Sequence, residues 1–179
     1  EKIGAFGLTE PNAGSDAAGG LATAVRDGDE YILNGTKIFI SNAGEAQIYV
    51  VTVKTQLHRG ARGMSAFIVE KGTPGFSFGK QEEKMCFHAQ ANRELIFQDC
   101  RVPAENLLGQ ENRGFRVAME TLDVGRIGMA VGAVGLAKAA LEKAINYAKE
   151  RIQFGQRIST FQAIQHKLAD MATEVEAAE

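Results

Sequence analysis

The sequence has few of the residues that build disulfide frameworks, metal centres or polyanion-binding surfaces. Its two cysteines, Cys86 and Cys100, form no CxxC pair, so we expect reduced thiols and no disulfide framework. Its three histidines are scattered, without metal-ligand spacing. A formal net charge of -2 predicts no binding to nucleic acid. No uninterrupted apolar run approaches the roughly 18 residues of a membrane span, so none is expected.

Proline is absent from the last 76 residues, and its absence divides the chain. Residues 1–102 hold 13 of the 20 glycines, whereas Ala, Leu, Glu and Lys dominate after Pro103. The first part therefore predicts strands and the second helices. We expect an α+β multidomain protein, with an antiparallel β-barrel or sandwich over residues 1–103. Residues 104–179 should form long antiparallel helices that are part of a four-helix bundle.

The two ends of the sequence read as cuts in a longer protein. The chain begins at Glu1 without Met or a signal peptide, and it ends in a helical pattern without a capping glycine. Its 179 residues are 45% hydrophobic and 23% charged, which is typical of one globular domain or two small ones. We expect a location in the cytoplasm, or in the mitochondrial matrix of a eukaryote, with the cytoplasm favoured.

Short apolar runs separated by turn residues predict the strands. The expected strands are residues 3–8, 21–26, 31–40, 48–54, 64–70, 76–78 and 93–98. Asn34-Gly35 interrupts the third of them and predicts a turn or bulge, because both residues tolerate positive φ. Residues 56–63 should form an exposed loop, and residues 104–109 a linker or short turn.

The chain is organised around the stretch Phe6-Gly7-Leu8-Thr9-Glu10-Pro11-Asn12-Ala13-Gly14-Ser15-Asp16. An apolar strand here breaks into a loop of turn-forming residues, which brings backbone amides and hydroxyls close to a ligand. By itself this pattern is also that of an ordinary strand exit. In a second stretch, alternation places Lys37, Phe39 and Ser41 on one strand face. A ring beside a hydroxyl there suits a planar ligand, and it equally suits a half-buried strand with a polar exit.

The second part of the chain predicts two helices. The first should run from Asn112 to about Phe154, with a break or kink at Asp123–Arg126, and Gly155 should follow its end. Small residues recur along one face of it, which predicts close approach by another helix or a ligand: Gly125, Gly128, Gly132, Gly135 and Ala139. Ser159 and Gln162 fit a capping box for the second helix. That helix should bury the face formed by Ile164, Leu168, Met171 and Val175.

Four blocks of the sequence, in order, resemble the acyl-CoA dehydrogenase family, and most closely its short-chain, butyryl-CoA type. The first block is Leu8 to Asp16 and the second is Asn34-Gly35-Thr36-Lys37-Ile38-Phe39-Ile40-Ser41-Asn42. The later two are Leu122-Asp123-Val124-Gly125-Arg126 and Glu150-Arg151-Ile152-Gln153-Phe154-Gly155. The resemblance covers essentially all residues. It implies that residues 1–103 are the family's middle β domain and residues 104–179 the first part of its C-terminal bundle.

The resemblance also implies the chemistry. Family members oxidise an acyl-CoA to the trans-2-enoyl-CoA: a glutamate removes the α proton and the β hydride passes to N5 of FAD. Electron transfer flavoprotein then accepts the electrons, and the enzyme is a homotetramer. An acyl-CoA oxidase, or a non-catalytic scaffold that binds flavin and CoA, remains an alternative. The sequence does not decide acyl chain length or electron acceptor.

Site residues follow from the same resemblance. Phe6, Leu8 and Thr9 match flavin contacts, as do Phe39 and Ser41, where the family often has Trp and Thr. Ser15 matches a contact to both CoA and FAD, and the block Asp123, Val124, Gly125 and Arg126 matches CoA contacts. Further positions match contacts to the FAD held mainly by a neighbouring subunit: Arg151, Phe154, Phe161 and Gln162.

Two features depart from the family pattern. Relatives commonly have Gly-hydrophobic-Arg where this chain has Cys86-Phe87-His88. If that glycine serves a positive-φ turn, Cys86 would strain the turn. This replacement also puts in doubt any contact that the arginine makes. The catalytic base lies on the helix of the third block in some branches, at the position of Gly125. Glycine cannot act as a base, so we expect the base beyond residue 179 and no dehydrogenase activity from these 179 residues alone.

Overall fold

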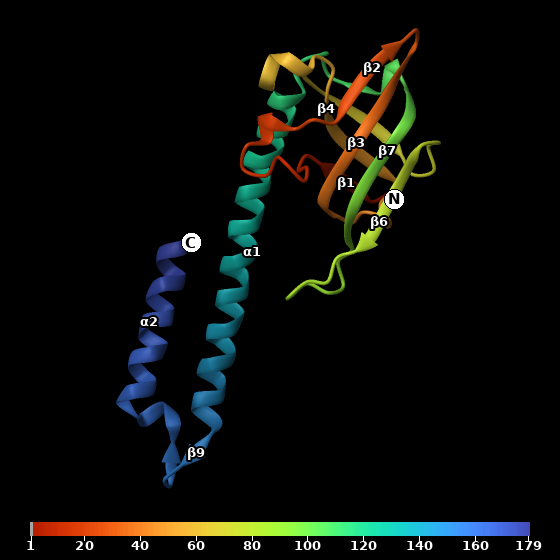
Figure 1. Cartoon of the computed structure of the whole chain (residues 1–179). Coiled ribbons are helices and arrows are strands. Elements are labelled where there is room, and N and C mark those ends of the chain that lie inside the picture. The colour runs from red at the N-terminus through yellow and green to blue at the C-terminus, as the bar shows by residue number, and fades with distance from the viewer. Residues whose placement is uncertain (1) are drawn as a thin grey trace. The chain divides into compact units, whose positions relative to one another are not determined.

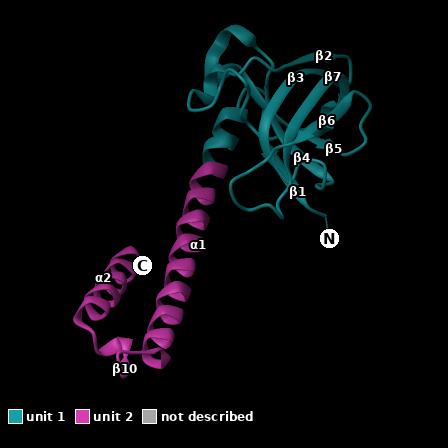
Figure 2. Cartoon of the chain, turned by 60° about the horizontal axis from the view of Figure 1, so that its bottom comes forward, with its two compact units in different colours: residues 1–120 teal, residues 121–179 magenta. Residues whose placement is uncertain are grey.

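The computed structural model describes residues 2–179, and these residues form two compact units. The first unit runs to Glu120 and the second from Thr121 to Glu179, as Figure 2 shows in teal and magenta. All the strands of the large sheet belong to the first unit, and most of the helical residues belong to the second.

Within the described residues, unit 1 is built on an eight-stranded sheet with the order β6-β7-β3-β2-β4-β5-β8, and β1 pairs with β4 (Figure 1). Three short 3₁₀ segments join the strands: η1 (Ala17–Gly19), η2 (Leu57–Gly63) and η3 (Ala104–Asn106). The strands are β1 (Gly4–Gly7), β2 (Thr23–Asp27), β3 (Glu30–Ser41), β4 (Ile48–Lys54), β5 (Met64–Glu70), β6 (Phe76–Gln81), β7 (Asn92–Pro103) and β8 (Leu107–Leu108).

The sheet is mixed, which modifies the expectation of a purely antiparallel one. β1 runs parallel to β4, and β2 meets β4 in one parallel pair, Thr23 with Lys54. The other pairings are antiparallel. The parallel position of β1 is what places the start of the loop after Gly7 beside the interior strands, because β4 lies between β2 and β5.

The core of unit 1 is formed by the inward-facing residues, which alternate with outward-facing ones along the strands. Leu33, Tyr49, Val51 and Leu95 are fully buried. Aromatic rings fill the centre, where Phe76 stacks on Phe97 with 4.9 Å between the ring centroids. Offset and edge-on ring pairs of this kind contribute roughly 0.5–1.5 kcal/mol beyond their buried area. The β-branched and aromatic content of these strands thus both favours the extended backbone and supplies the core.

Several strands lie where the sequence predicts them. β4 and β5 have the predicted bounds, and Asn34-Gly35 forms a bulge, where the pairing of β3 with β7 shifts register. The Asn34 side chain closes this bulge by accepting from the Asp99 amide at 2.8 Å. β7 is longer than predicted, because Asp99 takes φ +48° and re-phases the alternation beyond it. The linker expected over residues 104–109 contains strand β8, which pairs with β5.

Unit 2 contains most of the long helix α1 (Gly114–Glu150) and the helix α2 (Gln162–Ala178). Of the predicted break or kink at Asp123–Arg126, the break is wrong, since α1 is helical throughout, and a kink stays a prediction. One glycine in a helix interior costs only about 1 kcal/mol relative to alanine. A run of good helix formers on both sides of Gly125 outweighs that cost.

The connection between the helices is a small hairpin, which the sequence reading missed. The predicted extension of the first helix to Phe154 is wrong: β9 (Ile152–Gln153) pairs with β10 (Gln156–Arg157). The two turn residues take φ +52° and +77°, at Phe154 and Gly155. A two-residue turn with both φ values positive matches the right-handed twist of a hairpin. Gly155 therefore completes a hairpin turn and does not cap the helix.

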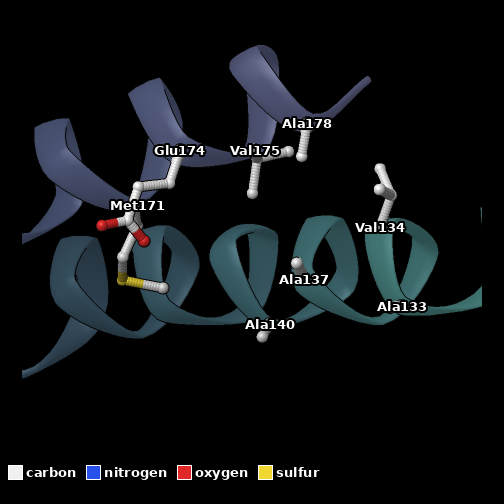
Figure 3. Close-up of a pocket in the computed structure, with 8 residues that line it drawn as sticks. All are labelled: Ala133, Val134, Ala137, Ala140, Met171, Glu174, Val175 and Ala178. Carbon is white, nitrogen blue, oxygen red and sulfur yellow. The ribbon is translucent and has the colours of Figure 1, made fainter. Parts of the chain in front are cut away.

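Helix α2 runs antiparallel to the part of α1 in unit 2 (Figure 1). Its predicted apolar face is confirmed as the half-buried side of the helix, formed by Ile164, Leu168, Met171 and Val175, although none of these residues is fully buried. The predicted capping box is wrong: Ser159 lies in η4 (Ile158–Thr160), and Phe161 occupies the N-cap without a side-chain hydrogen bond. An apolar groove of about 480 Å³ separates the helices (Figure 3), lined by Ala133, Val134, Ala137, Ala140, Met171, Glu174, Val175 and Ala178.

The small-residue stripe on α1 faces open space within the described residues. A Cβ atom built on Gly125, Gly128, Gly132 or Gly135 would meet nothing within 4 Å. The groove against α2 runs mainly along another part of the α1 surface, around Ala137, although Gly135 of the stripe lines a second pocket with Ala178. A partner for the stripe therefore stays a prediction.

By length and composition, α1 is able to cross a membrane. One such helix is a weak indication, because core helices of globular proteins share this composition. The expected absence of a membrane span thus stays a prediction.

Candidate functional site

The strand segment Lys37–Ser41 presents a ring and a hydroxyl together, although not through simple alternation. Phe39 takes φ +59°, and the register of β3 against β7 shifts between Lys37 and Ile40. Consequently Phe39 is 61% exposed and Ser41 is exposed, while Lys37 and Ile40 are buried. The prediction that Lys37 shares the face of Phe39 and Ser41 is therefore wrong.

The loop after β1 is a tight, hydrogen-bonded structure. Glu10 and Ala13 exchange two backbone hydrogen bonds, each of 3.0 Å. The Asn12 amide donates to the Gly19 carbonyl at 3.1 Å and ties the loop to η1. Ser15 and Asp16 are exposed on this loop, and Leu8 and Thr9 are half-buried.

Strand β3 holds this loop directly. The Ile38 amide donates to the Thr9 carbonyl at 2.9 Å, and the Lys37 ammonium donates to the Leu8 carbonyl at 3.0 Å. The structure thus brings together the first two sequence blocks, with Leu8 and Thr9 beside the β3 segment that carries Phe39. Phe6 precedes them as a half-buried residue of β1.

A buried ion pair lies beneath the loop, and the sequence reading assigned it no role. Lys37 Nζ lies 2.7 Å from Glu10 Oε1, and the two side chains are 0% and 4% exposed. Burial lowers the pKa of Lys37, and the nearby Glu10 carboxylate partly opposes that shift. The available signal was a lysine between apolar residues of a strand, since lysine is almost never fully buried unless paired.

A second polar feature of unit 1 is a cleft of about 490 Å³ lined by Arg59, Arg62, Asn112 and Arg113. Its first two arginines lie on η2, which the Lys54 ammonium holds by donating to the Gly60 carbonyl. No described ion pair involves the three arginines of the cleft. The cleft therefore presents positive charge that suits an anion, and the sequence predicted no binding role for any of these residues.

The predicted CoA-contacting block lies on α1 in unit 2. Asp123 and Arg126 form an exposed ion pair of 3.1 Å at i,i+3 spacing. Val124 is 72% exposed, and Gly125 faces open space. All four residues are accessible to a ligand, and their predicted role stays untested.

The hairpin after α1 gathers the residues predicted to reach a neighbouring subunit's cofactor. Phe154 at its tip is 93% exposed and meets Phe161 edge-on, with 6.2 Å between the ring centroids. The Arg151 carbonyl accepts from the Ile158 amide at 2.9 Å, and the Arg151 side chain is exposed. Gln162 begins α2 beside Phe161 and is also exposed.

The segment that departs from the family pattern is an exposed loop. Its positive φ of +54° falls on Phe87, not on Cys86, so the strain expected at Cys86 does not arise. His88 Nε2 lies 2.7 Å from the Lys84 carbonyl oxygen. Cys86 is exposed, whereas Cys100 is buried in the core.

The chain is a mixed-sheet unit followed by one long helix and one shorter helix. Residues 5–100 match the middle domain of acyl-CoA dehydrogenases, and residues 112–179 match their C-terminal domain. The chain belongs to the acyl-CoA dehydrogenase family.

Particular relatives narrow the similarity. The short-chain specific acyl-CoA dehydrogenase of Megasphaera elsdenii is 55% identical over 178 residues, which are 99% of this chain and 46% of the relative. The solved structure of butyryl-CoA dehydrogenase from that organism matches with a TM-score of 0.95 over 98% of this chain and 46% of its own. The acryloyl-CoA reductase (NADH) of Anaerotignum propionicum is 54% identical over 99% of this chain and 45% of the relative.

A chain from a structure of the electron transferring flavoprotein of Acidaminococcus fermentans is 60% identical to this one. It matches with a TM-score of 0.95, over 98% of this chain and 46% of its own. The chain thus spans about half the length of the relatives it matches.

Proposed function

We propose that the protein containing this chain oxidises a short-chain acyl-CoA to the trans-2-enoyl-CoA, with FAD as the hydride acceptor. Family membership and the similarity to a short-chain specific enzyme support this activity. The activity is a proposal for the whole protein, because the chain spans about half of its relatives.

The observation that carries the proposal is the attachment of the Leu8–Asp16 loop to β3. The 2.9 Å hydrogen bond from Ile38 to Thr9 places the loop next to the residue that exposes its ring, Phe39. A flat aromatic face, a hydroxyl two residues later and the polar backbone of a loop are suited to a planar, hydrogen-bonding ring system. The residues present therefore fit a flavin.

Each side chain then has a defined task. FAD, when bound, supplies the acceptor for the β hydride of the substrate. The Phe39 ring forms a wall against the flavin, and the Ser41 hydroxyl supplies a hydrogen bond at its edge. Thr9 and the backbone of Leu8 orient it from the loop, and Phe6 supports the start of that loop.

The CoA portion of the substrate is assigned to a second set of exposed residues. Ser15 contacts CoA from the loop, and Asp123, Val124, Gly125 and Arg126 contact it from α1. The arginine cleft of unit 1 suits the phosphate groups of such a ligand, because one guanidinium group can donate two parallel hydrogen bonds to the oxygens of a phosphate. The catalytic base is expected outside this chain, since Gly125 has no side chain to act as one.

Assembly and partners complete the proposal. Arg151, Phe154, Phe161 and Gln162 are accessible side chains, as contacts to the FAD of a neighbouring subunit require, and we infer a homotetramer. Electron transfer flavoprotein is the proposed electron acceptor, consistent with the Acidaminococcus structure and with a subunit of a caffeyl-CoA reductase-Etf complex that is 53% identical. The proposed location is the cytoplasm, or the mitochondrial matrix of a eukaryote.

A second candidate is the reverse reaction, reduction of an enoyl-CoA. Two relatives above 50% identity are named as reductases, of acryloyl-CoA and of caffeyl-CoA.

The purified full-length protein should show a flavin absorbance band at about 450 nm. It should oxidise butyryl-CoA with a dye or flavoprotein acceptor and react slowly with oxygen.

The same assay separates the alternatives. Fast reoxidation by oxygen would identify an oxidase. Reduction of enoyl-CoA without butyryl-CoA oxidation would identify a reductase, and flavin binding without turnover a scaffold. Absence of any bound flavin would refute the proposal.

A further inference from the structure

We propose that Lys37 is a positioning residue of the flavin site, which sets the place of the Leu8–Thr9 backbone through its hydrogen bond to Leu8 and its ion pair with Glu10. The proposal rests on the proposed function, because it assigns this backbone to the flavin. It adds a residue that neither contacts the ligand in the proposal above nor belongs to the exposed face of β3.

The Lys37 side chain connects β3 to the loop from inside the unit. It is 0% exposed, and its ammonium group donates to the Leu8 carbonyl at 3.0 Å and to Glu10 Oε1 at 2.7 Å. An apolar side chain of the same length could fill this space but could not satisfy the Leu8 carbonyl. The charge therefore fixes the position of a specific backbone atom in addition to packing.

Glu10 extends the connection to the other side of the loop. Its carboxylate accepts from the Leu21 amide at 2.5 Å and from the Ala22 amide at 3.1 Å, just before β2. Gly20 makes this approach possible, since a Cβ atom there would lie 2.7 Å from Glu10 Oε1. The first residues of the loop, Leu8 to Glu10, are thus fastened both to β3 and to the segment just before β2.

The connection lies next to the ligand-facing residues in the sequence and in space. Lys37 holds the Leu8 carbonyl, Ile38 holds the Thr9 carbonyl, and the next residue, Phe39, exposes its ring. Three consecutive β3 residues therefore set the distance between the loop and the aromatic wall. Displacement of the loop or of the Phe39 ring would therefore change the contacts available to a bound flavin.

Stability alone does not account for a buried ion pair. Replacing such a pair with uncharged groups of similar volume is often neutral or stabilising, whereas removing one partner leaves an uncompensated charge and is strongly destabilising. A double variant therefore separates stability from positioning. Lys37→Met with Glu10→Gln removes both charges, and the side-chain amide oxygen introduced by Glu10→Gln still accepts from the backbone amides of Leu21 and Ala22.

The experiment compares the full-length parent with K37M, K37M/E10Q and a control, R101M. Arg101 belongs to an exposed ion-pair cluster of the same unit, with Asp27 and Glu30. The measurements are the denaturant midpoint, amide hydrogen exchange of residues 8–16 in flavin-free protein, the Kd for FAD, and the flavin reduction potential and visible spectrum.

We expect K37M to lower the denaturant midpoint of unfolding. The double variant K37M/E10Q should regain most of that loss. In both variants exchange at residues 8–16 should accelerate at least about tenfold, the Kd for FAD should rise at least about tenfold, and the flavin spectrum and potential should shift. R101M should change none of these. A double variant with parental loop exchange and a Kd within twofold of the parent would overturn the proposal.

The proposed function can fail separately. A parent that binds no FAD would refute it, and the hydrogen exchange of flavin-free protein would then still decide whether Lys37 positions the loop. Parental exchange at residues 8–16 in the double variant would overturn the positioning role in that case as well.

Discussion

Replacing Phe39 with glycine should separate flavin binding from the stability of the β unit. Phe39 has φ +59°, a conformation that costs an L residue roughly 1–2 kcal/mol and that glycine adopts freely. The substitution removes that strain. It also removes the ring, which the proposed function assigns to the wall of the flavin site.

The magnitude follows from how little of the ring is covered. The side chain is 61% exposed, so about 80 Å² of a ~200 Å² side chain is buried, worth about 2 kcal/mol at roughly 25 cal/mol per Å². The greater freedom of glycine in the unfolded chain costs a further ~0.5–1 kcal/mol. Relief of strain offsets roughly half of the sum, so the net loss should be about 1 kcal/mol.

The assay pairs urea unfolding of the flavin-free protein with an FAD titration. We expect F39G to lose about 1 kcal/mol of unfolding free energy, whereas FAD affinity falls about 2- to 13-fold, since stacking on one aromatic face contributes roughly 0.5–1.5 kcal/mol. Phe97→Ala serves as the control for a buried ring, because Phe97 is 2% exposed and its loss should cost about 3–5 kcal/mol. Unchanged FAD affinity in F39G, or a stability loss near that of the control, would refute the reasoning.

Four further predictions concern other parts of the chain. Arg62→Ala should raise the KM for butyryl-CoA several-fold with kcat unchanged, and the effect should disappear with a substrate that lacks the 3′-phosphate; an equal effect on both substrates would contradict a phosphate contact. A thiol reagent should label Cys86 in the native protein and Cys100 only after unfolding. Burial raises the pKa of the Cys100 thiol to about 11. The stability that comes from keeping this buried thiol neutral is therefore present below pH 9.0 and is lost as the pH rises through about 11. Gly114→Ala should destabilise the chain by several kcal/mol in thermal unfolding, because its Cβ would lie 2.3 Å from the Ser65 carbonyl carbon. Gly132→Ala should stabilise the 179-residue chain by up to ~1 kcal/mol, since alanine favours helix and its Cβ would meet no atom within 4 Å. A loss of stability would show that the small-residue stripe packs against another surface.

The local sequence pattern predicted those elements in which secondary-structure propensity and burial favour the same structure. β4 and β5 have the predicted bounds because unbroken runs of β-branched and apolar residues end at charged residues. The buried face of α2 follows from helical periodicity in the same way. In these elements local propensity and burial agree, so reading either one suffices.

The errors fall where a single residue was read as a helix signal. Gly125 was expected to break α1, yet a cost of about 1 kcal/mol is small beside the propensity of the residues around it. Gly155 was read as a helix cap, but with Phe154 it completes a hairpin turn. Positive φ suits both structures, so the glycine alone does not distinguish them. The pairing of Gln153 with Gln156 across the two-residue turn shows that the turn belongs to a hairpin.

The candidate site was predictable as stretches of sequence and not as a connected structure. The first two blocks located the loop and the β3 segment, and the structure shows that they are hydrogen-bonded to each other. The Lys37–Glu10 pair joins residues 27 positions apart, so no local pattern contains it. Strict alternation misplaced Lys37, because the reading took no account of a register shift after it.

That register shift explains how one short segment can anchor the loop and expose a ring. In an unbroken strand, residues 37 and 39 point to the same side, so Lys37 and Phe39 would be buried together or exposed together. The positive φ of Phe39 breaks the alternation, and Lys37 stays buried beside Glu10 while the ring turns outward. Removing the irregularity would cost either the anchor or the aromatic wall. The strain at Phe39 is thus the local cost of placing both functions within three residues, which is why we expect strain and ligand binding to change together when Phe39 is replaced.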